Sequence, residues 1–435
     1  MRHLLVISHF FPPMGGGGVQ RVAKFVKYLP QHGWRTTVLS GRAEDYWMRD
    51  ESLANEIPPS TRVVRTAAAS GLGILRRVGG VPAARRSAGG FGFLRRAGAW
   101  MLIPDTYVGW RPFALRAARD ILRADPPAAI LSTGPPETNH LVALALRRET
   151  GLPWLADFRD PWFGLHLFPA PTRWHRRQHQ ALERDVLRAA DCLVATTTWL
   201  RDLLRERAAA AARIHVIRNG YDPEDFGAAP VPPPDPGGPL VLAHTGMLTL
   251  SRSAAGLLQG LGTLLERQPE LRGRVRVELV GARESANDAL VTSAGLRDCV
   301  RFRGYVPHRD AIAAMLAADV LVLIKHADAR YRGLVPGKLY EYLGAGRPIL
   351  ALVPESEAAD LIRELGCGEV VPPGDGEAVA RALAAFLEAK QAGTLVTRYR
   401  TAAAAAFTRP EQARNLAALL DQIAPRVATA VGAMP

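Results

Sequence analysis

Cysteine is scarce in this chain, which has three cysteines among 435 residues, at positions 192, 299 and 367. They are scattered, odd in number and without a Cys-x-x-Cys pair, which argues against a disulfide framework and a zinc site. Other metal signatures are also missing, because no two aspartates stand two residues apart and no His-Glu-x-x-His sequence occurs. We therefore expect a cytoplasmic protein with no metal and no other cofactor.

Long apolar runs are absent too. No uninterrupted stretch approaches the roughly 18–20 residues of a membrane-spanning helix, and Asp319 interrupts one of the best candidates, residues 311–324. The first eight residues are too short for a signal-peptide core, and we expect them to form a buried strand. With 48% hydrophobic and 22% charged residues, the composition is that of a soluble globular protein. The length predicts two or three domains.

Lysine contributes only five of the 55 basic residues, and the excess over 41 acidic residues gives a net charge of +14. Between Glu56 and Asp105 there are eight arginines and no acidic residue, with apolar and aromatic residues interleaved. This mixture suits an anionic membrane surface, so residues 57–104 are a candidate lipid-binding segment. A solvated basic loop is the equal alternative. No recognised nucleic-acid-binding module is present, so no nucleic-acid partner is expected.

Apolar runs of four to seven residues alternate with amphipathic stretches along the chain, the pattern of βα units around a parallel sheet. A first series of strands is expected at about 3–9, 34–40, 62–66, 128–132, 153–158, 192–196 and 214–217. A second series is expected at about 240–244, 274–280, 299–303, 319–324, 348–352 and 368–371. Between the series, residues 227–239 contain too much proline and glycine for a helix or a central strand.

The predicted fold is therefore α/β, with two doubly wound, Rossmann-like parallel-sheet domains facing a central cleft. The expected boundaries are 1–226 for the first domain, 227–239 for the linker and 240–405 for the second domain. Residues 406–435 are expected to form a C-terminal helix packed back on the first domain. Ligands of such domains bind outside the carboxyl ends of the strands.

The first strand leads into four successive glycines, Gly15, Gly16, Gly17 and Gly18, and then into a helix. Without Cβ atoms, their backbone N–H groups can converge on an anion at the helix N-terminus. A dinucleotide fingerprint would need a glycine near Gln20 and an acidic residue closing the second strand, and neither is present. The pattern favours a loop around a phosphate or a sugar, with a merely flexible loop as the alternative.

Charged residues also follow other strands. Arg159 and Asp160 end the strand 153–158, where they belong at the mouth of the cleft and could surround a reacting sugar. The alternative is a structural Arg–Asp pair that satisfies loop backbone. His140 opens a helix after another strand and is either a functional histidine or a packing or capping residue.

The most informative stretch is residues 333–348. Gly337 starts a short helix on which Lys338 and Glu341, three residues apart, share a face near the positive end of the helix dipole. A cation there is electrostatically misplaced unless an anion such as a diphosphate is bound, and a carboxylate one turn further on can accept both hydroxyls of a ribose. The alternative is a surface Lys–Glu pair worth a few tenths of a kcal/mol. In the second domain's first loop, after Gly246, Arg252 stands just before a helix N-terminus, where it is either an anion ligand or a solvated arginine.

Taken together, these segments resemble a bacterial glycosyltransferase of family 4, with the two-Rossmann-domain fold called GT-B, in a subfamily with an Asp-Phe-Arg-Asp-Pro-Trp motif. The matching segments span nearly the whole chain in the expected order: the glycine loop, Thr-Gly-Pro-Pro (133–136), Ala-Asp-Phe-Arg-Asp-Pro-Trp (156–162), Ile-Arg-Asn-Gly-Tyr-Asp-Pro-Glu-Asp-Phe (217–226), His-Thr-Gly (244–246), Phe-Arg-Gly-Tyr-Val-Pro-His (302–308) and Pro-Gly-Lys-Leu-Tyr-Glu-Tyr-Leu (336–343). The resemblance implies a donor-binding C-terminal domain, an acceptor-binding N-terminal domain, and transfer that retains the anomeric configuration, usually without a metal.

Carried over by residue, Glu341 resembles the glutamate that binds the donor ribose. Arg252 stands where the family has a diphosphate-binding lysine, and Lys338 resembles a second diphosphate contact. Gly304 and Tyr305 would lie beside the base.

The chain also departs from the family pattern. A second glutamate of the family corresponds to Gly333 in this chain. The basic residue that often follows the Gly246 position in the family corresponds to Met247. The family's active-site histidine falls on Arg159, so its role passes to Arg159, Asp160 or His140.

The predicted function is a retaining glycosyltransferase that moves a hexose from a nucleoside-diphosphate sugar, with UDP as the expected nucleotide. The expected acceptor is lipid-linked or a polysaccharide such as lipopolysaccharide, at the inner face of the cell membrane. The alternatives are a GT-B sugar-nucleotide 2-epimerase and a non-catalytic basic protein that binds nucleic acid.

Overall fold

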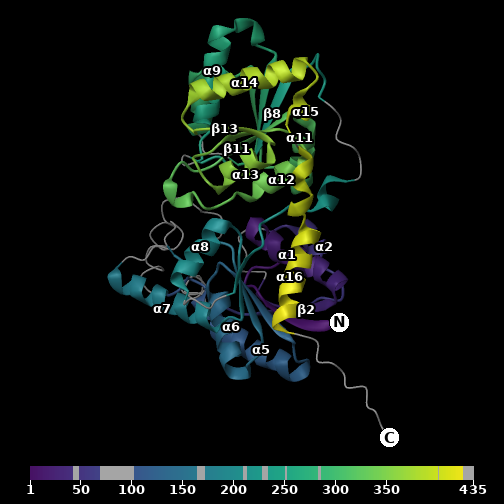
Figure 1. Ribbon diagram of the computed structural model, residues 1–435, viewed down its shortest axis with the longest axis vertical. Coiled ribbons are helices and arrows are strands. Elements are labelled where there is room, and N and C mark those ends of the chain that lie inside the picture. The colour runs from purple at the N-terminus through teal and green to yellow at the C-terminus, as the bar shows by residue number, and fades with distance from the viewer. Residues whose placement is uncertain are drawn as a thin grey trace, which may run out of the picture. The chain divides into compact units, whose positions relative to one another are not determined.

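The computed structural model describes residues 1–42, 49–68, 102–163, 172–208, 213–227, 234–249, 252–282, 286–399 and 401–424. They form two compact units: Met1–Arg218 with Arg409–Pro435, and Asn219–Thr408 (Figure 1). Most of the candidate lipid-binding segment, residues 69–101, lies outside the described residues.

The first unit is built on a seven-stranded sheet in which every neighbouring pair is parallel. In sheet order its strands are β3 (Arg62–Thr66), β2 (Trp34–Gly41), β1 (Arg2–Ile7), β4 (Ala129–Gly134), β5 (Trp154–Phe158), β6 (Cys192–Ala195) and β7 (Ile214–Val216). The order reverses direction between β1 and β4, which makes this pair the topological switch point of the sheet.

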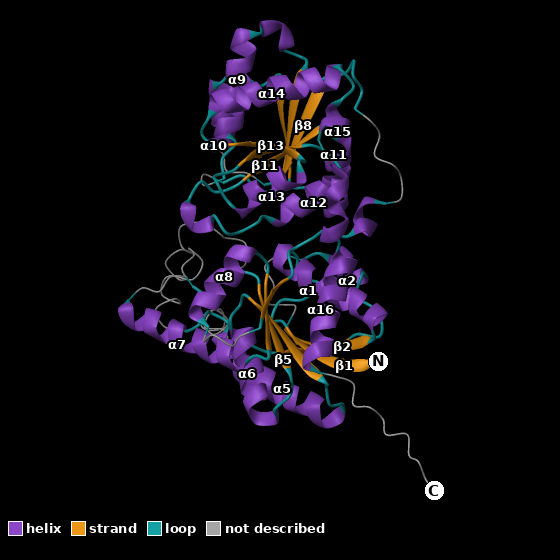
Figure 2. Ribbon diagram, viewed as in Figure 1, coloured by secondary structure: helices purple, strands orange, loops and turns teal. Residues whose placement is uncertain are grey.

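Helices cover both faces of this sheet (Figure 2). Successive residues of β1 point to opposite faces, so Leu4 and Val6 pack toward one set of helices while Leu5 and Ile7 pack toward the other. One face is covered by α1 (Gly17–Tyr28) and α16 (Arg409–Ile423), the other by α5 (Arg111–Ala124), α6 (Thr138–Thr150), α7 (Arg173–Ala189) and α8 (Thr198–Arg207). The shorter elements are η1 (Leu29–His32), α2 (Glu51–Asn55) and η3 (Val108–Trp110).

The second unit has a six-stranded parallel sheet with its switch point between β8 and β11. In sheet order its strands are β10 (Val300–Gly304), β9 (Val275–Val280), β8 (Leu240–Thr245), β11 (Val320–Ile324), β12 (Ile349–Leu352) and β13 (Gly368–Val371). One face packs against α9 (Ala255–Arg267), α10 (Ala286–Ser293), α14 (Gly376–Gln391) and α15 (Leu395–Arg398), the other against α11 (His308–Ala317), α12 (Gly337–Ala345) and α13 (Glu357–Leu365). Its described residues also form the 3-10 turns η4 (Pro223–Phe226), η5 (Pro269–Leu271), η6 (Ala329–Tyr331) and η7 (Thr401–Phe407).

The structure confirms the predicted fold of two doubly wound parallel-sheet domains. Every expected strand is present within two residues at either end. The agreement is close because a buried parallel strand is a continuous apolar run, which is visible in the sequence by itself. Within the described residues, no helix is long and apolar enough to cross a membrane.

The division between the units falls after Arg218 rather than in the proline-rich stretch 227–239. Residues 219–226 lie in the second unit because Tyr221 and Phe226 pack against α12, where a Cβ added at Gly344 would come within 2.5 Å of the Tyr221 ring. Proline content indicates where helices and strands end. The boundary between the two units depends instead on which core the side chains pack into.

The last described helix, α16, belongs to the first unit. Its buried Leu416 and Leu420 share a hydrophobic cluster with Phe25 and Val26 of α1. The side chain of Arg2 in β1 also forms an ion pair with Asp421.

Candidate functional site

The loops at the two switch points, together with the helices that follow them, carry most of the residues that the sequence singled out. In open α/β sheets, ligands bind outside the carboxyl ends of the strands at such a point. In the first unit these loops are the glycine loop after β1 and the Pro135–Pro136 loop after β4. In the second unit they are the Gly246 loop after β8 and the segment between β11 and α12.

The second unit brings Lys338 and Glu341 into direct contact. Nζ of Lys338 donates a hydrogen bond to Oε2 of Glu341 at 2.7 Å, and the two side chains are 34% and 13% exposed. Nε2 of His308, the first residue of α11, lies 3.5 Å from Oε1 of the same carboxylate. The anion that the sequence required beside Lys338 is therefore supplied, in this structure, by Glu341 itself.

These two cations govern the ionisation of Glu341. Burial favours a higher pKa, but the His308 ring and the Lys338 ammonium outweigh it and bring the pKa of Glu341 to about 2. In return, the Glu341 carboxylate raises the pKa of His308 against the opposing effect of burial. Sequence reasoning missed His308, because its contact with α12 arises only when α11 and α12 pack together.

A buried network fixes the end of β8 against β11 and α12. Nδ1 of His244 lies 2.9 Å from the carbonyl oxygen of Val322, and the Tyr342 hydroxyl donates to the same oxygen at 3.3 Å. The hydroxyl also accepts from the backbone N–H of Thr245 at 3.0 Å. Burial is the main cause that raises the pKa of Tyr342 to about 12 and lowers that of His244 to about 4. The charges of Lys338 and Arg252 contribute to this lowering of the pKa of His244.

The predicted glycines of the second unit leave room at its loops. A methyl group added at Gly337 would meet nothing within 4 Å, so the N-terminus of α12 is open. Gly246 and Gly304 have φ values of +152° and +68°, conformations that side-chain-bearing residues rarely adopt. Tyr305, which follows β10, is 74% exposed. Arg252 pairs with Thr249 through backbone hydrogen bonds, and its Nε is buried.

In the first unit, the glycine loop is held by Arg159. Gly16, at φ +108°, precedes α1, whose N-terminus has no side-chain cap. The Arg159 guanidinium donates to the carbonyl oxygens of Gly18, Gly134 and Pro135. It therefore ties the loop after β1 to the loop after β4, which corresponds to the structural alternative for this residue.

His140 lies in the core. Its side chain is fully buried and stacks on Phe158 with ring centroids 4.5 Å apart, while Nδ1 lies 2.8 Å from Oγ of Ser132. Burial is the main cause that lowers the pKa of His140 to about 3, so the ring is neutral. This environment matches the packing alternative.

Burial raises the pKa of two carboxyl groups near these loops, those of Glu137, which is 1% exposed, and Asp160, which is partly buried. The pKa of Asp160 rises despite the opposing charge of Arg159. The pKa of Glu137 rises well above its ordinary value, because the charges of Asp105 and Asp160 add to the effect of burial. Glu137 was not predicted from the sequence, since nothing local distinguishes it from an exposed helix-start glutamate.

A further ion pair was missed, between Arg21 of α1 and Asp157 of β5. Both side chains are 1% exposed, and Nη2 lies 2.8 Å from Oδ1. Asp157 also accepts a hydrogen bond from Oγ1 of Thr133 at 2.8 Å, and Arg21 donates to the carbonyl oxygens of residues 217 and 218. This pair holds the carboxyl end of β5 in place beside the glycine loop's helix.

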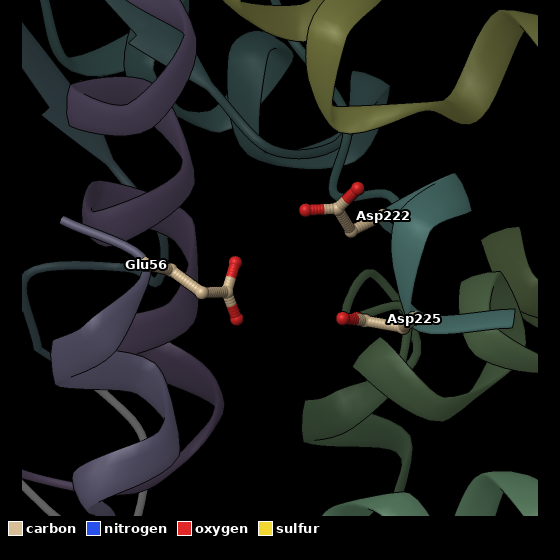
Figure 3. A group of neighbouring side chains, drawn as sticks. All are labelled: Glu56, Asp222 and Asp225. Carbon is tan, nitrogen blue, oxygen red and sulfur yellow. The ribbon is translucent and has the colours of Figure 1, made fainter. Parts of the chain in front are cut away.

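Figure 3 shows three carboxylates, of which Glu56 belongs to the first unit and Asp222 and Asp225 to the second. Each is part of local structure in its own unit. Glu56 pairs with Lys24 and Lys27, and Asp222 caps η4, the 3-10 turn that contains Asp225, by accepting a backbone N–H at 3.1 Å. In the described parts of the chain, no group of three potential metal ligands lies within a single unit.

Two family models match the chain: the glycosyl transferase 4-like domain over residues 16–220, and glycosyl transferases group 1 over residues 246–389. A D-inositol 3-phosphate glycosyltransferase of Streptomyces coelicolor is 30% identical over 232 residues, which are 47% of this chain and 50% of that protein. The chain belongs to the GT-B glycosyltransferases.

A mannosylfructose-phosphate synthase of Agrobacterium fabrum is 32% identical to this GT-B protein over 34% of the chain and 35% of the synthase. The chain thus spans about half the length, or less, of the curated relatives that it matches.

Solved structures match over nearly the full length. Sucrose-phosphate synthase from Thermosynechococcus elongatus has a TM-score of 0.64 at 17% identity, covering 97% of this chain and 99% of that one. HepE of Anabaena, in complex with UDP and glucose, has a TM-score of 0.62 at 15% identity, covering 97% and 100%. WaaG, a glycosyltransferase involved in lipopolysaccharide biosynthesis, has a TM-score of 0.59 at 16% identity, covering 98% and 100%. At these identities the likeness establishes the GT-B fold.

Proposed function

We propose that this GT-B protein is a retaining, family 4 hexosyltransferase that uses a UDP-sugar to build a cell-surface glycan. One observation carries the proposal: Lys338 contacts Glu341, and both Lys338 and Arg252 lie close enough to His244 of β8 to lower its pKa. The carboxyl end of β8 is at the switch point, where a doubly wound sheet binds its ligand. Two cations and one carboxylate, held beside an open helix N-terminus, match the diphosphate and the ribose of a nucleotide sugar.

The Lys338–Glu341 contact is the resting form of this site. When the donor binds, its diphosphate takes over Lys338 and its ribose hydroxyls take over the carboxylate of Glu341. His308 stays beside Glu341, whose carboxylate favours the charged form of its ring. Arg252 and Lys338 then neutralise the charge that grows on the leaving diphosphate as the bond to the sugar breaks.

UDP is the proposed nucleotide because HepE, which shares the fold, was solved with UDP and with UDP-glucose. A lipid-linked or polysaccharide acceptor is proposed from the likeness to WaaG and to the lipopolysaccharide galactosyltransferase WaaB. The acceptor would bind the first unit, with Asp160 as the candidate contact for its hydroxyl group. The arginine-rich residues 57–104 are proposed to hold the protein on the anionic inner face of the cell membrane.

Kinetics of two variants test the donor site. Loss of Lys338 in Lys338→Met should lower kcat by roughly 10²–10³-fold, because its charge acts mainly on the transition state. Glu341→Gln should raise KM for the donor more than it lowers kcat, because ribose contacts change little during transfer. Arg363→Met, which breaks exposed contacts with Glu355 and Asp360 at α13, is the control and should keep wild-type kinetics.

Donor binding is measured first by thermal stabilisation with UDP, GDP and their sugars. A ligand at about 100 times its Kd should stabilise the protein by roughly 2.7 kcal/mol. Stabilisation by none of them, or wild-type kcat and KM in both variants, would remove the nucleotide-sugar site from the second unit. Conversion of the donor to its 2-epimer without an acceptor would identify an epimerase instead.

A further inference from the structure

Buried polar atoms near the proposed donor site that have no hydrogen-bond partner among the described residues include an acceptor, Nε2 of His244, and a donor, Nε of Arg252. The His244 side chain as a whole is nine-tenths buried, at 6% exposure. Burying an unpaired polar group is costly, and such groups in native structures call for an explanation. A bound ligand that supplies both a donor and an acceptor would explain the two atoms together.

The bond between His244 and Val322 determines what His244 can bind. The partner of Nδ1 is a carbonyl oxygen, which can only accept, so Nδ1 carries the proton. In a neutral ring the other nitrogen, Nε2, then bears a lone pair and is an acceptor. Burial, together with the charges of Lys338 and Arg252, lowers the pKa of His244 to about 4, so the ring is neutral at physiological pH. The ligand group beside Nε2 must therefore be a hydrogen-bond donor.

The chemistry of a nucleotide sugar limits which of its groups can donate this hydrogen bond to Nε2. The diphosphate has only acceptor oxygens at neutral pH, and these suit Arg252 and Lys338. The ribose hydroxyls are assigned to Glu341. The base is expected beside Gly304 and Tyr305 at the end of β10, which is separated from β8 by β9. The remaining hydrogen-bond donors of the ligand are the hydroxyl groups of the sugar that is transferred.

Gly246 leaves room beside this nitrogen. It follows β8 directly, and a Cβ added there would lie 3.4 Å from Nε2 of His244. A Cβ at this position would be in contact with the ring nitrogen, whereas glycine keeps side-chain atoms away from this side of Nε2.

We propose that Nε2 of His244 accepts a hydrogen bond from a hydroxyl group of the transferred hexose, and thereby helps to select the sugar of the donor. The inference rests on the proposed function, since it requires a nucleotide sugar in the second unit. It adds a sugar-recognising residue to the cations and the carboxylate that hold the diphosphate and the ribose.

Two substitutions distinguish the roles of the two ring nitrogens of His244. His244→Asn places an amide N–H near the position of Nδ1, which preserves donation to Val322, but it has no acceptor at the position of Nε2. His244→Gln places its longer amide near Nε2, which preserves the acceptor, but it loses the bond to Val322. A purely structural histidine would tolerate Asn better than Gln, whereas sugar recognition requires the opposite order.

Calorimetry of UDP and of the best UDP-hexose, with both variants and wild type, provides the test. We expect the Kd of UDP to stay unchanged in His244→Asn, while the Kd of the UDP-hexose rises by roughly 3- to 10-fold, the worth of one hydrogen bond. His244→Gln should bind the UDP-hexose more tightly than His244→Asn does, even if it unfolds at a lower temperature. A deoxy-fluoro analogue lacking the recognised hydroxyl should weaken binding to wild type but not further weaken binding to His244→Asn.

Failure of the inference differs from failure of the proposed function. If UDP does not bind wild type, the proposed function fails. If UDP binds but the ratio of the UDP-hexose and UDP affinities is the same in wild type and His244→Asn, the inference is overturned and the nucleotide site stands. Uptake of a proton when UDP binds wild type but not His244→Asn, measured in two buffers of different ionisation enthalpy, would also overturn it. That result would show a charged imidazolium on the diphosphate.

Discussion

Nε2 of His308 lies 3.5 Å from Oε1 of Glu341, an ion pair that joins the first turn of α11 to α12. The carboxylate has Lys338 on its other side, at 2.7 Å. Glu341 therefore lies between two cations of different kinds. The lysine is available to a phosphate, and the histidine changes its charge near neutral pH.

The first prediction concerns pH. Because the neighbouring Glu341 carboxylate raises the pKa of His308 above its ordinary value of 6.5, the pair stabilises the fold fully below pH 6.5. This contribution is lost as the pH rises through the raised pKa. His308→Gln should therefore unfold more easily than wild type by roughly 0.2–1 kcal/mol at about pH 5.5, and by almost nothing at about pH 9. Urea unfolding across this range measures the difference, and a difference independent of pH would contradict the ion pair.

The second prediction concerns the buried pair Arg21–Asp157. Arg21→Met leaves the carboxylate of Asp157 buried without its main cation, which should lower the free energy of unfolding by about 3–5 kcal/mol. Arg123→Met removes an ion pair of the same type between exposed side chains, Arg123 and Asp120, and should cost less than about 1 kcal/mol. Equal effects of the two substitutions in denaturant titrations would show that Arg21 is not buried as described.

The third prediction concerns two helical glycines of the second unit. Gly344→Ala would place a methyl group within 2.5 Å of the Tyr221 ring and 2.8 Å of the Phe226 ring, so it should destabilise the unit by roughly 1–3 kcal/mol. Gly262→Ala on α9 meets nothing within 4 Å and should stabilise by about 0.5–1 kcal/mol. Thermal unfolding of both variants checks the packing of residues 219–226 on α12. A stabilising Gly344→Ala would refute it.

The fourth prediction concerns the metal-free mechanism that we propose. If Arg252, Lys338 and backbone N–H groups neutralise the leaving diphosphate, transfer should continue at an unchanged rate in excess EDTA. The product should keep the anomeric configuration of the donor, which proton NMR of the new glycosidic bond reports. Activity that disappears on chelation and returns with magnesium or manganese would require a metal site instead.

The sequence by itself determined the elements of this protein. The strands were predictable because buried parallel strands are continuous apolar runs, and the start of α12 because Pro336 and Gly337 mark it locally. The placement of Lys338 and Glu341 on one helical face followed from their spacing of three residues. These features depend on residues that are close together along the chain, so a short segment of sequence is enough to predict them.

Only the tertiary structure decided which of these elements meet. Arg21 and Asp157 are 136 residues apart, and His244 reaches the carbonyl of Val322 across 78 residues, because strand order places β8 beside β11. Packing also turned Arg159 toward three loop carbonyls and placed His140 in the core, although the sequence allowed a functional role for both. The partner of a charged or titratable side chain depends on which surfaces the fold buries against each other. The residues next to it in the sequence do not identify that partner.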